Sequence, residues 1–334
     1  MATGTTTYGD INQRTAAYAA VEFLSHATPV LVLQQFGQIK ELPKNKADTI
    51  KFRRTIPFGP ATVPLQEGVT PSARKMEFED VEAQLRQYGD VVEITDVVED
   101  LSEDPVLREA MTQCGEQAGA TFEQLAYGKL KAATNVFFAN GSALDQVNTE
   151  ITLNKQRSVT RSLSRNKAKR ITRILDGSVK VGTRPVEAAY VAVTHTDVED
   201  SLRGLTGFKT TAEYGSRKPL DENEVGSVEK VRYITSPDLQ PLEDAGGAKG
   251  SSPEMLSTSG VNADVYPILY FGQEAFGIVP LAGKRAVTPT VVNKKPSDSD
   301  PLAQRTKVGW KAYFTAVILN QAWMARLMVA VEKL

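Results

Sequence analysis

The stretch KFRRTIPFGPATVPLQEGVTP, residues 51–71, is the feature that most restricts the fold of this 334-residue chain. It begins as a strand and is then interrupted by four prolines, at positions 57, 60, 64 and 71, and by glycines at positions 59 and 68. Proline removes a backbone donor and fixes φ, so no regular strand or helix continues through such a segment. Five apolar residues lie between these breakers, too few for a core and too many for a plain solvated linker: Ile56, Phe58, Val63, Leu65 and Val69.

The segments on either side of this stretch alternate in polarity, which predicts two strands. Ile50 and Phe52 share one parity before the prolines. After them, the apolar residues change parity between Phe78 and Val81, which predicts a one-residue bulge near Glu79–Asp80. We therefore expect residues 48–88 to form two long strands joined by an irregular tip. A two-stranded arm is marginally stable alone, and its apolar tip predicts a contact surface on another chain.

Two segments have the apolar periodicity of helices. The first predicts one very long helix over residues 102–138, with Ser102 or Asp104 as its cap and Asn140–Gly141 as its end. The second predicts a helix over residues 158–176 with one apolar side and one strongly basic side.

Alternation and composition describe the other segments more coarsely. Residues 1–10 are polar, and residues 11–36 are interpreted as helix or mixed structure interrupted at Pro29. Residues 205–300 combine short apolar runs with many Gly, Pro and Ser residues, which predicts a β-rich lobe with long loops. Residues 310–318 alternate as a strand, whereas AWMARLMVAV, which follows them, fits either a strand or a short helix.

Composition argues against several classes of protein. The net charge of −1 and the 24% of charged residues are ordinary for a globular chain, and they argue against nucleic-acid binding through a general basic face. The single cysteine, Cys114, excludes an intramolecular disulfide framework and any multi-cysteine metal site. No apolar window is long enough for a transmembrane helix, so no membrane association is expected.

Catalytic constellations are not evident in the sequence. Neither a G-x-x-x-x-G-K-[ST] phosphate loop nor a G-x-G-x-x-G motif after a strand occurs. Cys114 lies on the apolar stripe of the long predicted helix, where burial makes a thiol inert. His26 and His195 are interpreted as structural histidines, and the carboxylates of HTDVED as the polar first turn of a helix. We therefore expect no enzymatic activity, no cofactor and no metal.

The basic side of the helix predicted over residues 158–176 is the best candidate for a nucleic-acid contact. Arginines and lysines at positions 157–173 could contact phosphates. No aromatic residues are interleaved with them for base stacking. A solvated face or a contact between subunits is the favoured interpretation of this basic side, and the phosphate contact is the alternative.

The order and wording of several segments along nearly the whole chain resemble the major capsid proteins of tailed bacteriophages, of the podovirus type. These segments are LPKNKADTIKFRR, LQEGVTP, QYGDVVEITD, YVAVTHTDVEDSLR, DENEVGSVEKVRYITS, VYPILYFGQEAFGIVPL and DPLAQRTKVGWKAYFTAVILNQAW. The resemblance implies an α+β chain with the tailed-phage and herpesvirus capsid fold. It implies an N-terminal arm (1–47), an extended loop (48–88), a peripheral domain (89–189 and 305–334) with a spine helix over 102–138, and an axial domain (190–304).

The function that this resemblance implies is structural. Hexamers and pentamers of the chain would close into an icosahedral phage head around double-stranded DNA, which is held without sequence-specific binding. A separate scaffolding protein and a portal are implied as partners, and a decoration protein is a further candidate. The virion is the implied location, with the host cytoplasm during assembly. Encapsulin-like bacterial nanocompartments share the fold and are the alternative.

The extended loop is expected to lie over the adjacent subunit. Its apolar tip would contact the neighbour directly, and two arginines would add charge pairs. The predicted contact residues are Arg53, Arg54, Ile56, Phe58, Val63, Leu65 and Glu67.

Overall fold

A computed structural model describes residues 31–42, 47–65, 67–68, 70–101, 106–176, 182–215, 217–281, 288–292, 302 and 304–334. The α-helices in these ranges are α2 (Asp96–Leu101), α3 (Val106–Leu130), α4 (Leu153–Arg165) and α5 (Glu199–Arg203). Short 3-10 turns are η3 (Leu33–Gln35), η4 (Leu144–Gln146), η5 (Thr196–Val198), η6 (Thr211–Tyr214) and η7 (Gln321–Trp323). No helix in the described part of the chain is long and apolar enough to cross a membrane.

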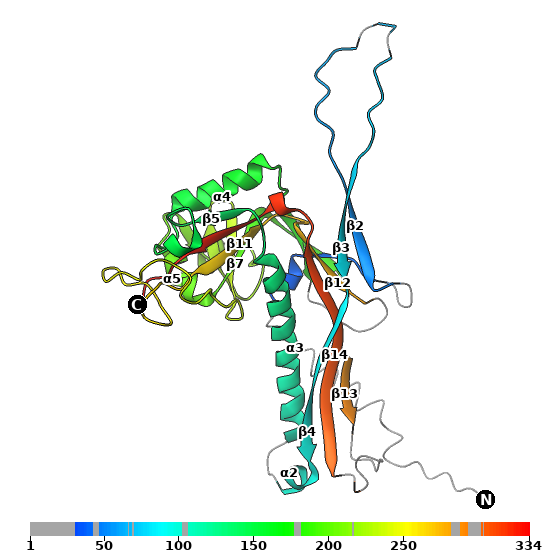
Figure 1. The fold of residues 1–334 in the computed structure, drawn as a ribbon, viewed down its shortest axis with the longest axis vertical. Helices are drawn as coiled ribbons and strands as arrows, with labels where there is room; N and C mark the ends of the chain where they lie inside the picture. The colour runs from blue at the N-terminus through cyan, green and yellow to red at the C-terminus, as the bar shows by residue number, and fades with distance from the viewer. Residues whose placement is uncertain are drawn as a thin grey trace, which may run out of the picture.

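A five-stranded sheet and helix α3 form an elongated body, drawn in the lower half of Figure 1. Its strands are β1 (Gln38–Ile39), β12 (Phe276–Pro280), β14 (Arg305–Ile318), β13 (Thr288–Val292) and β4 (Arg86–Thr95). The central strand, β14, pairs antiparallel with β4 on one side and with β12 and β13 on the other. The alternation predicted at residues 310–318 is confirmed, because Trp310, Ala312 and Phe314 are buried under α3.

An eight-stranded sheet forms the lobe on the left of Figure 1. Its strands, in spatial order, are β5 (Val136–Phe138), β15 (Met324–Val329), β11 (Tyr266–Phe271), β7 (Gly182–Thr194), β10 (Val231–Thr235), β9 (Glu224–Val228) and β8 (Phe208–Thr210), with β6 (Ile171–Asp176) paired to β7. All six residues of β11 are buried. A continuous apolar run of this kind is expected for a strand that is covered on both faces.

Two hydrophobic clusters cover the two faces of this lobe sheet. Alternate residues of β11 divide between them: Leu269 and Phe271 belong to the cluster under α3, and Ile268 and Tyr270 belong to the cluster under α4. The lobe sheet therefore joins the core of the elongated body to a second core of its own.

Helix α3 is the spine of the molecule, and its predicted apolar stripe is buried as expected. Met111, Cys114 and Ala118 lie on this stripe, and Phe122 extends it toward β14. The Phe122 ring lies 5.8 Å from the Trp310 ring and 5.1 Å from the Phe314 ring, measured between centroids. Such aromatic pairs add to the free energy of area burial, so the helix and β14 form one rigid unit.

Two predicted helices end earlier than the sequence suggested. The helix predicted over 102–138 ends at Leu130, and residues 136–138 form strand β5, which pairs parallel with β15. Asn140–Gly141 therefore ends no helix, and the predicted caps Ser102 and Asp104 lie outside the described residues. The apolar residues Val136, Phe137 and Phe138 fit both helical and strand spacing, and the β-branched and aromatic types prefer the strand.

The helix predicted over 158–176 is also divided. Thr152 caps α4 by accepting a hydrogen bond from the N–H of Lys155, and the helix ends at Arg165. Lys167 then adopts a positive φ of 55°, which is incompatible with helix continuation. Residues 171–176 form β6.

The remaining predictions for the termini have mixed outcomes. AWMARLMVAV contains strand β15, which settles the open choice between strand and helix. Most of the helix or mixed structure expected over residues 11–36 falls on residues 1–30, outside the described part. The described end of that segment forms the 3-10 turn η3, in which Leu33 is fully buried.

Candidate subunit interface

The hairpin arm consists of β2 (Thr49–Thr55), β3 (Phe78–Gln84) and the tip, residues 56–77, and it projects beyond both sheets at the top of Figure 1. The two strands pair in an unbroken antiparallel register from Thr49↔Gln84 to Thr55↔Phe78. The bulge predicted near Glu79–Asp80 is therefore wrong. The parity of the apolar residues changes because Phe78 lies on the opposite face of the ribbon from Val81, with its ring 5.5 Å from the Arg53 guanidinium.

Charged cross-strand pairs hold the two strands together. Arg53 donates two hydrogen bonds to Asp80, at 2.8 and 2.9 Å, and Lys51 lies 2.6 Å from Glu82. Arg54 pairs with Glu79 on the opposite face. Each of these pairs joins direct register partners. The arginines predicted to pair with a neighbour are thus already paired with carboxylates of their own arm, and exposed pairs of this kind contribute little stability each.

The root of the arm is anchored in a small hydrophobic cluster. Ile50 and Phe52 of β2 and Ala83 of β3 are buried against Val279 of β12 and Leu42. The opposite face of the ribbon carries the Lys51–Glu82 and Arg53–Asp80 pairs and remains exposed. The arm is therefore fixed at its base and is not a free hairpin.

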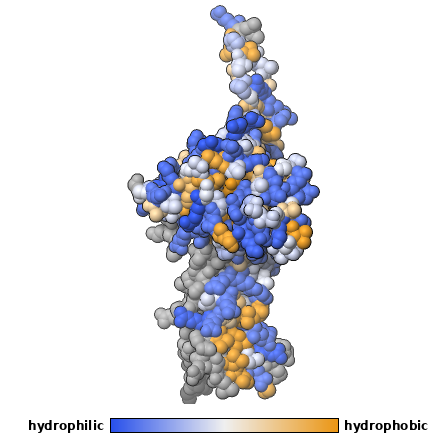
Figure 2. All heavy atoms as spheres, turned by 90° about the vertical axis from the view of Figure 1, so that its left-hand side faces the viewer, coloured by the Kyte–Doolittle hydropathy of each residue, from blue (hydrophilic) through white to orange (hydrophobic). Residues whose placement is uncertain are grey.

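The tip has no such anchor. The exposed fractions of its apolar side chains are 42% for Ile56, 55% for Phe58, 82% for Val63 and 77% for Leu65. Glu67 is exposed beside them at a turn. Figure 2 shows this end projecting well clear of the lobe, with hydrophobic and hydrophilic atoms mixed along it. The predicted contact residues therefore lie on one projection, the two arginines at the tip end of β2 and the rest in the tip.

A hollow that the sequence analysis missed lies on the face of the five-stranded sheet opposite α3. Its volume is about 230 Å³, and its lining is almost entirely apolar. Val91 of β4 and Val292 of β13 form its walls, and both are at least half exposed. Gly309 of β14 forms the floor, since a Cβ at this position would lie 2.9 Å from the Val91 side chain. Lys307 and Lys311 flank Gly309 along the same strand.

The sequence contains one signal for this hollow, namely that Val91 and Val92 are consecutive and so face opposite sides of a strand. Val92 lies on the α3 side with Ile94, which leaves Val91 on the outer face. More apolar surface lies at the end of the body, where Val97 and Val98 of α2 are exposed. On the face drawn in Figure 2, hydrophobic residues gather below the lobe, whereas hydrophilic residues cover most of the lobe itself.

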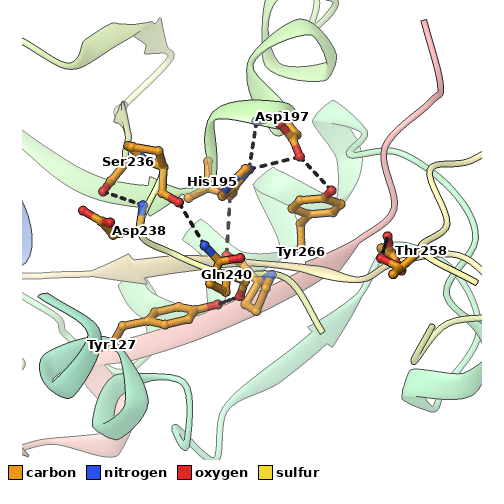
Figure 3. Close-up of polar contacts among 12 residues, drawn as sticks. Tyr127, His195, Asp197, Ser236, Asp238, Gln240, Thr258 and Tyr266 are labelled. Atoms are coloured by element: carbon orange, nitrogen blue, oxygen red, sulfur yellow. Dashed lines mark hydrogen bonds and ion pairs between the residues drawn. The ribbon is translucent and has the colours of Figure 1, made fainter. Parts of the chain in front are cut away.

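The polar cluster around His195 is the other feature that could suggest chemistry, and Figure 3 shows how it is arranged. His195 follows β7, and its Nδ1 accepts a hydrogen bond from the N–H of Asp197 at 3.1 Å. The Tyr266 hydroxyl donates to the Asp197 carboxylate at 2.8 Å. Asp197 lies in η5, and Glu199 and Asp200 begin α5, as the sequence predicted. These contacts fix the turn from strand to helix, which is a structural role.

No group of three or more metal-ligating side chains was found within the described ranges. Cys114 is buried on the spine helix, and burial raises the pKa of its thiol. A raised pKa keeps the thiol protonated and unreactive, as expected from its position on the stripe.

Comparison with known proteins places these features in a family. The profile described as "Phage capsid protein" matches residues 78–327, which is most of the chain. The chain belongs to this phage capsid protein family. The major capsid protein of Pseudomonas phage KPP21 is 22% identical over 266 residues, or 73% of this chain. The match spans 66% of that relative, slightly less than two thirds of its length.

Solved phage capsids share the fold of this capsid family member. The capsid of Ralstonia phage GP4 has a TM-score of 0.63 at 12% identity, covering 91% of this chain and 90% of the other. The cyanophage Pam1 capsid has a TM-score of 0.63 at 15% identity, covering 92% and 93%. The α+β capsid fold implied by the sequence resemblance is thereby confirmed. An encapsulin from Synechococcus elongatus is also similar, with a TM-score of 0.52 at 9% identity, covering 88% and 85%.

Proposed function

We propose that the chain is the major capsid protein of a phage, a structural subunit that builds an icosahedral head from hexamers and pentamers around double-stranded DNA. The observation that carries this proposal is the hairpin arm. Its root is anchored in the subunit, while Ile56, Phe58, Val63 and Leu65 of its tip lie outside the hydrophobic clusters formed by the described residues. An apolar surface of this kind is stabilised when another chain covers it. Family membership supports a phage head over an encapsulin-like shell.

The proposed occupant of the hollow beside Val91 is the arm tip of an adjacent subunit. Both surfaces are apolar, and the hollow is flanked by Lys307 and Lys311 while the tip carries Glu67. Complementary charge at the rim of an apolar contact favours a defined register. Contacts that pass from one face of a subunit to a different face of the next close into a ring when the rotation between subunits closes, and a capsomer is such a ring.

The domain assignment is part of the same proposal. The lobe sheet would be the axial domain, and α3 with the five-stranded sheet would be the peripheral domain. The strands cross the boundaries expected from the sequence: β12 lies within 190–304 yet pairs with β14, and β15 lies within 305–334 yet pairs with β11. A scaffolding protein, a portal, a decoration protein and transit through the host cytoplasm before residence in the virion belong to this proposal as well.

Substitution of the tip tests the assembly role. Phe58→Asp or Leu65→Asp is expected to give a folded subunit with the wild-type melting temperature that forms no shells. Each change removes an apolar side chain whose burial in a contact is worth about 1.5–3 kcal/mol, and the loss is repeated at every contact of a closed shell. Val91→Asp, on the exposed wall of the hollow, is expected to act in the same way.

The matched control is Thr62→Asp, which adds the same charge to an exposed position of the tip without removing an apolar group. Calorimetry and sedimentation would be performed on the same samples, with shells counted by electron microscopy. Normal shells from Leu65→Asp would refute a docking role for the tip. A lowered melting temperature of Phe58→Asp would instead mean that the tip belongs to the core of its own subunit.

A further inference from the structure

The surface formed by α4 and the segment after it carries a concentration of positive charge that the assembly role does not use. Residues 151–175 contain eight Lys and Arg residues and no Asp or Glu. The rest of the chain is acidic overall, because the whole chain has a net charge of −1. The positive charge is therefore localised on one part of the lobe.

Three arginines of α4 form a row along its solvent-facing side. Arg157, Arg161 and Arg165 follow one another at i, i+4 spacing, and all three are exposed. Four residues of an α-helix rise about 6 Å, so the row spans about 12 Å. The opposite side of the helix carries buried Val159 and Leu163. Packing against the lobe sheet therefore fixes the direction in which the arginine row points.

A shallow pocket beside this row has the lining of an anion site. Its volume is about 270 Å³. Arg157 and Arg161 contribute guanidinium groups, Lys230 contributes an ammonium, and Thr160 and Ser164 contribute hydroxyl groups. The lining also contains one carboxylate, Glu229, which is paired with Arg157. The β9–β10 turn brings Lys230 to α4, and the Arg170 guanidinium lies 5.8 Å from the ring of Tyr190, which also lines the pocket. Cations from two separate segments, α4 and the β9–β10 turn, thus line the pocket, and Arg170 lies against the Tyr190 ring.

Little of this charge is neutralised inside the subunit. Arg157 pairs with Glu229 at 2.5 Å. Within the part of the chain that the structure describes, no ion pair joins Arg161, Arg165 or Lys230 to an acid. Five of the eight basic residues are arginines, whose planar donor groups bind phosphate oxygens in pairs. Tyr190, the aromatic residue in the pocket lining, is buried, so its ring is not available as a stacking platform for single-stranded bases.

We propose that this basic surface, defined by Arg157, Arg161, Arg165, Arg170 and Lys230, binds the phosphate backbone of double-stranded DNA without reading its sequence. The proposal rests on the proposed function, since it assigns a contact between the subunit and the DNA that the head encloses. Arginine-rich charge, hydroxyl donors and the lack of aromatic platforms favour duplex phosphates over single strands. The row of guanidinium groups would follow one strand, with the pocket holding one phosphate.

Fluorescence anisotropy of the full-length free subunit with a labelled 30-base-pair duplex, measured at several salt concentrations, tests this assignment. The test variant is Arg161→Gln/Arg165→Gln/Lys230→Gln. The control variant, Lys129→Gln/Lys209→Gln/Lys218→Gln, removes the same charge from exposed positions elsewhere. Each lost phosphate contact lowers the slope of log K against log salt by about 1. For the test variant, the slope of log K against log salt should therefore be smaller in magnitude by about 3. Its affinity for the duplex at low salt should fall at least tenfold.

The results expected from the alternative explanations differ from one another. Equal weakening by both variants would mean that binding follows net charge, and an unaffected test variant would mean that DNA binds elsewhere; both refute the proposal. Poly-glutamate that displaces the duplex at equal charge concentration would indicate an acidic protein partner instead. Electron microscopy of shells from the same variants tests the proposed function independently, because shell formation does not enter the anisotropy measurement. Melting curves verify that both variants are folded.

Discussion

At the scale of single residues, one buried carboxylate joins the spine helix to the N-terminal segment. Glu123 of α3 is fully buried, and the N–H of Leu33 donates to its two oxygens at 2.9 and 3.2 Å. Burial raises the pKa of Glu123 to about 8, partly offset by the hydrogen bond from Leu33, and the negative charges of Asp238 and Asp221 raise it further. The carboxyl group is thus held near the point of titration at neutral pH.

This raised pKa makes the free energy of unfolding depend on pH. The folded state keeps its proton up to about pH 8, whereas an unfolded glutamate releases it near its ordinary pKa of 4.5. The contribution of Glu123 to stability is therefore complete below pH 4.5 and is lost as the pH rises to 8, at about 1.4 kcal/mol per pH unit. Glu123→Gln, which stays neutral and keeps an acceptor for Leu33, should flatten this decline.

Urea unfolding at several pH values between 4.5 and 8.5 measures the effect. The variant should gain stability over the wild type as the pH rises. Glu116→Gln, at an exposed position of the same helix, is the control and should follow the wild-type curve. Parallel pH profiles of Glu123→Gln and the wild type would show that the carboxyl group of Glu123 titrates normally.

Sequence reasoning found part of this residue-scale picture. Burial of Met111, Cys114 and Phe122 followed from helical spacing, because period alone decides which side of a helix is covered. The burial of Glu123 did not follow, since a charged residue beside Gln124 gives no sign of burial or of a partner. That partner, Leu33, lies 90 residues away in the sequence.

At the scale of elements, the hairpin arm is divided into an anchored root and an unanchored tip, and two phenylalanines distinguish the halves. Phe52 is buried in the root cluster, whereas Phe58 at the tip is exposed. Phe52→Ala should lower the free energy of unfolding by about 3 kcal/mol, as for a core aromatic. Phe58→Ala, the matched control, should change it by about 0.5 kcal/mol or less.

Urea midpoints of the free subunit compare the two variants. Equal destabilisation by both would mean that the tip folds back onto its own subunit. An unchanged midpoint for Phe52→Ala would mean that the root cluster contributes nothing to global stability.

The elements themselves were predicted unevenly, and the reason is physical. The two strands of the arm and strand β14 followed from alternation of apolar and polar residues, although the change of parity between Phe78 and Val81 led to a wrongly predicted bulge. Residues 136–138 were assigned to a helix because a run of three apolar residues fits either period. Their strand conformation depends on pairing with β15 near the other end of the chain, and no local pattern contains that information. The positive φ of Lys167, which separates α4 from β6, could likewise not be predicted from the local sequence.

At the scale of the whole molecule, the two sheets and the arm follow from contacts between distant segments. β14 joins β4, β12 and β13, and β11 lies between β7 and β15. Periodicity predicted most of these strands but not their order. The resemblance to capsid proteins supplied the architecture, and the comparisons confirm that family and fold. The hollow beside Val91 exists only because β4, β14 and β13 come together, so it could not be predicted from any one segment.

Hydrogen exchange distinguishes segments that are already buried in the free subunit from segments that become buried only when an adjacent subunit binds. Strand β11 is buried on both faces within one subunit, so its amides should exchange slowly in the free subunit and in shells alike. The described residues of the tip (56–65, 67–68 and 70–77) lie beyond the paired strands and are exposed, so their amides should exchange rapidly in the free subunit. If the tip docks on an adjacent subunit, the same amides should become protected in shells, together with those around Val91.

Peptide-resolved exchange of free subunits and purified shells measures this, with β11 as the internal control. If the tip amides are already protected in the free subunit, the tip packs against its own chain. If they still exchange rapidly in shells, the tip does not dock on an adjacent subunit.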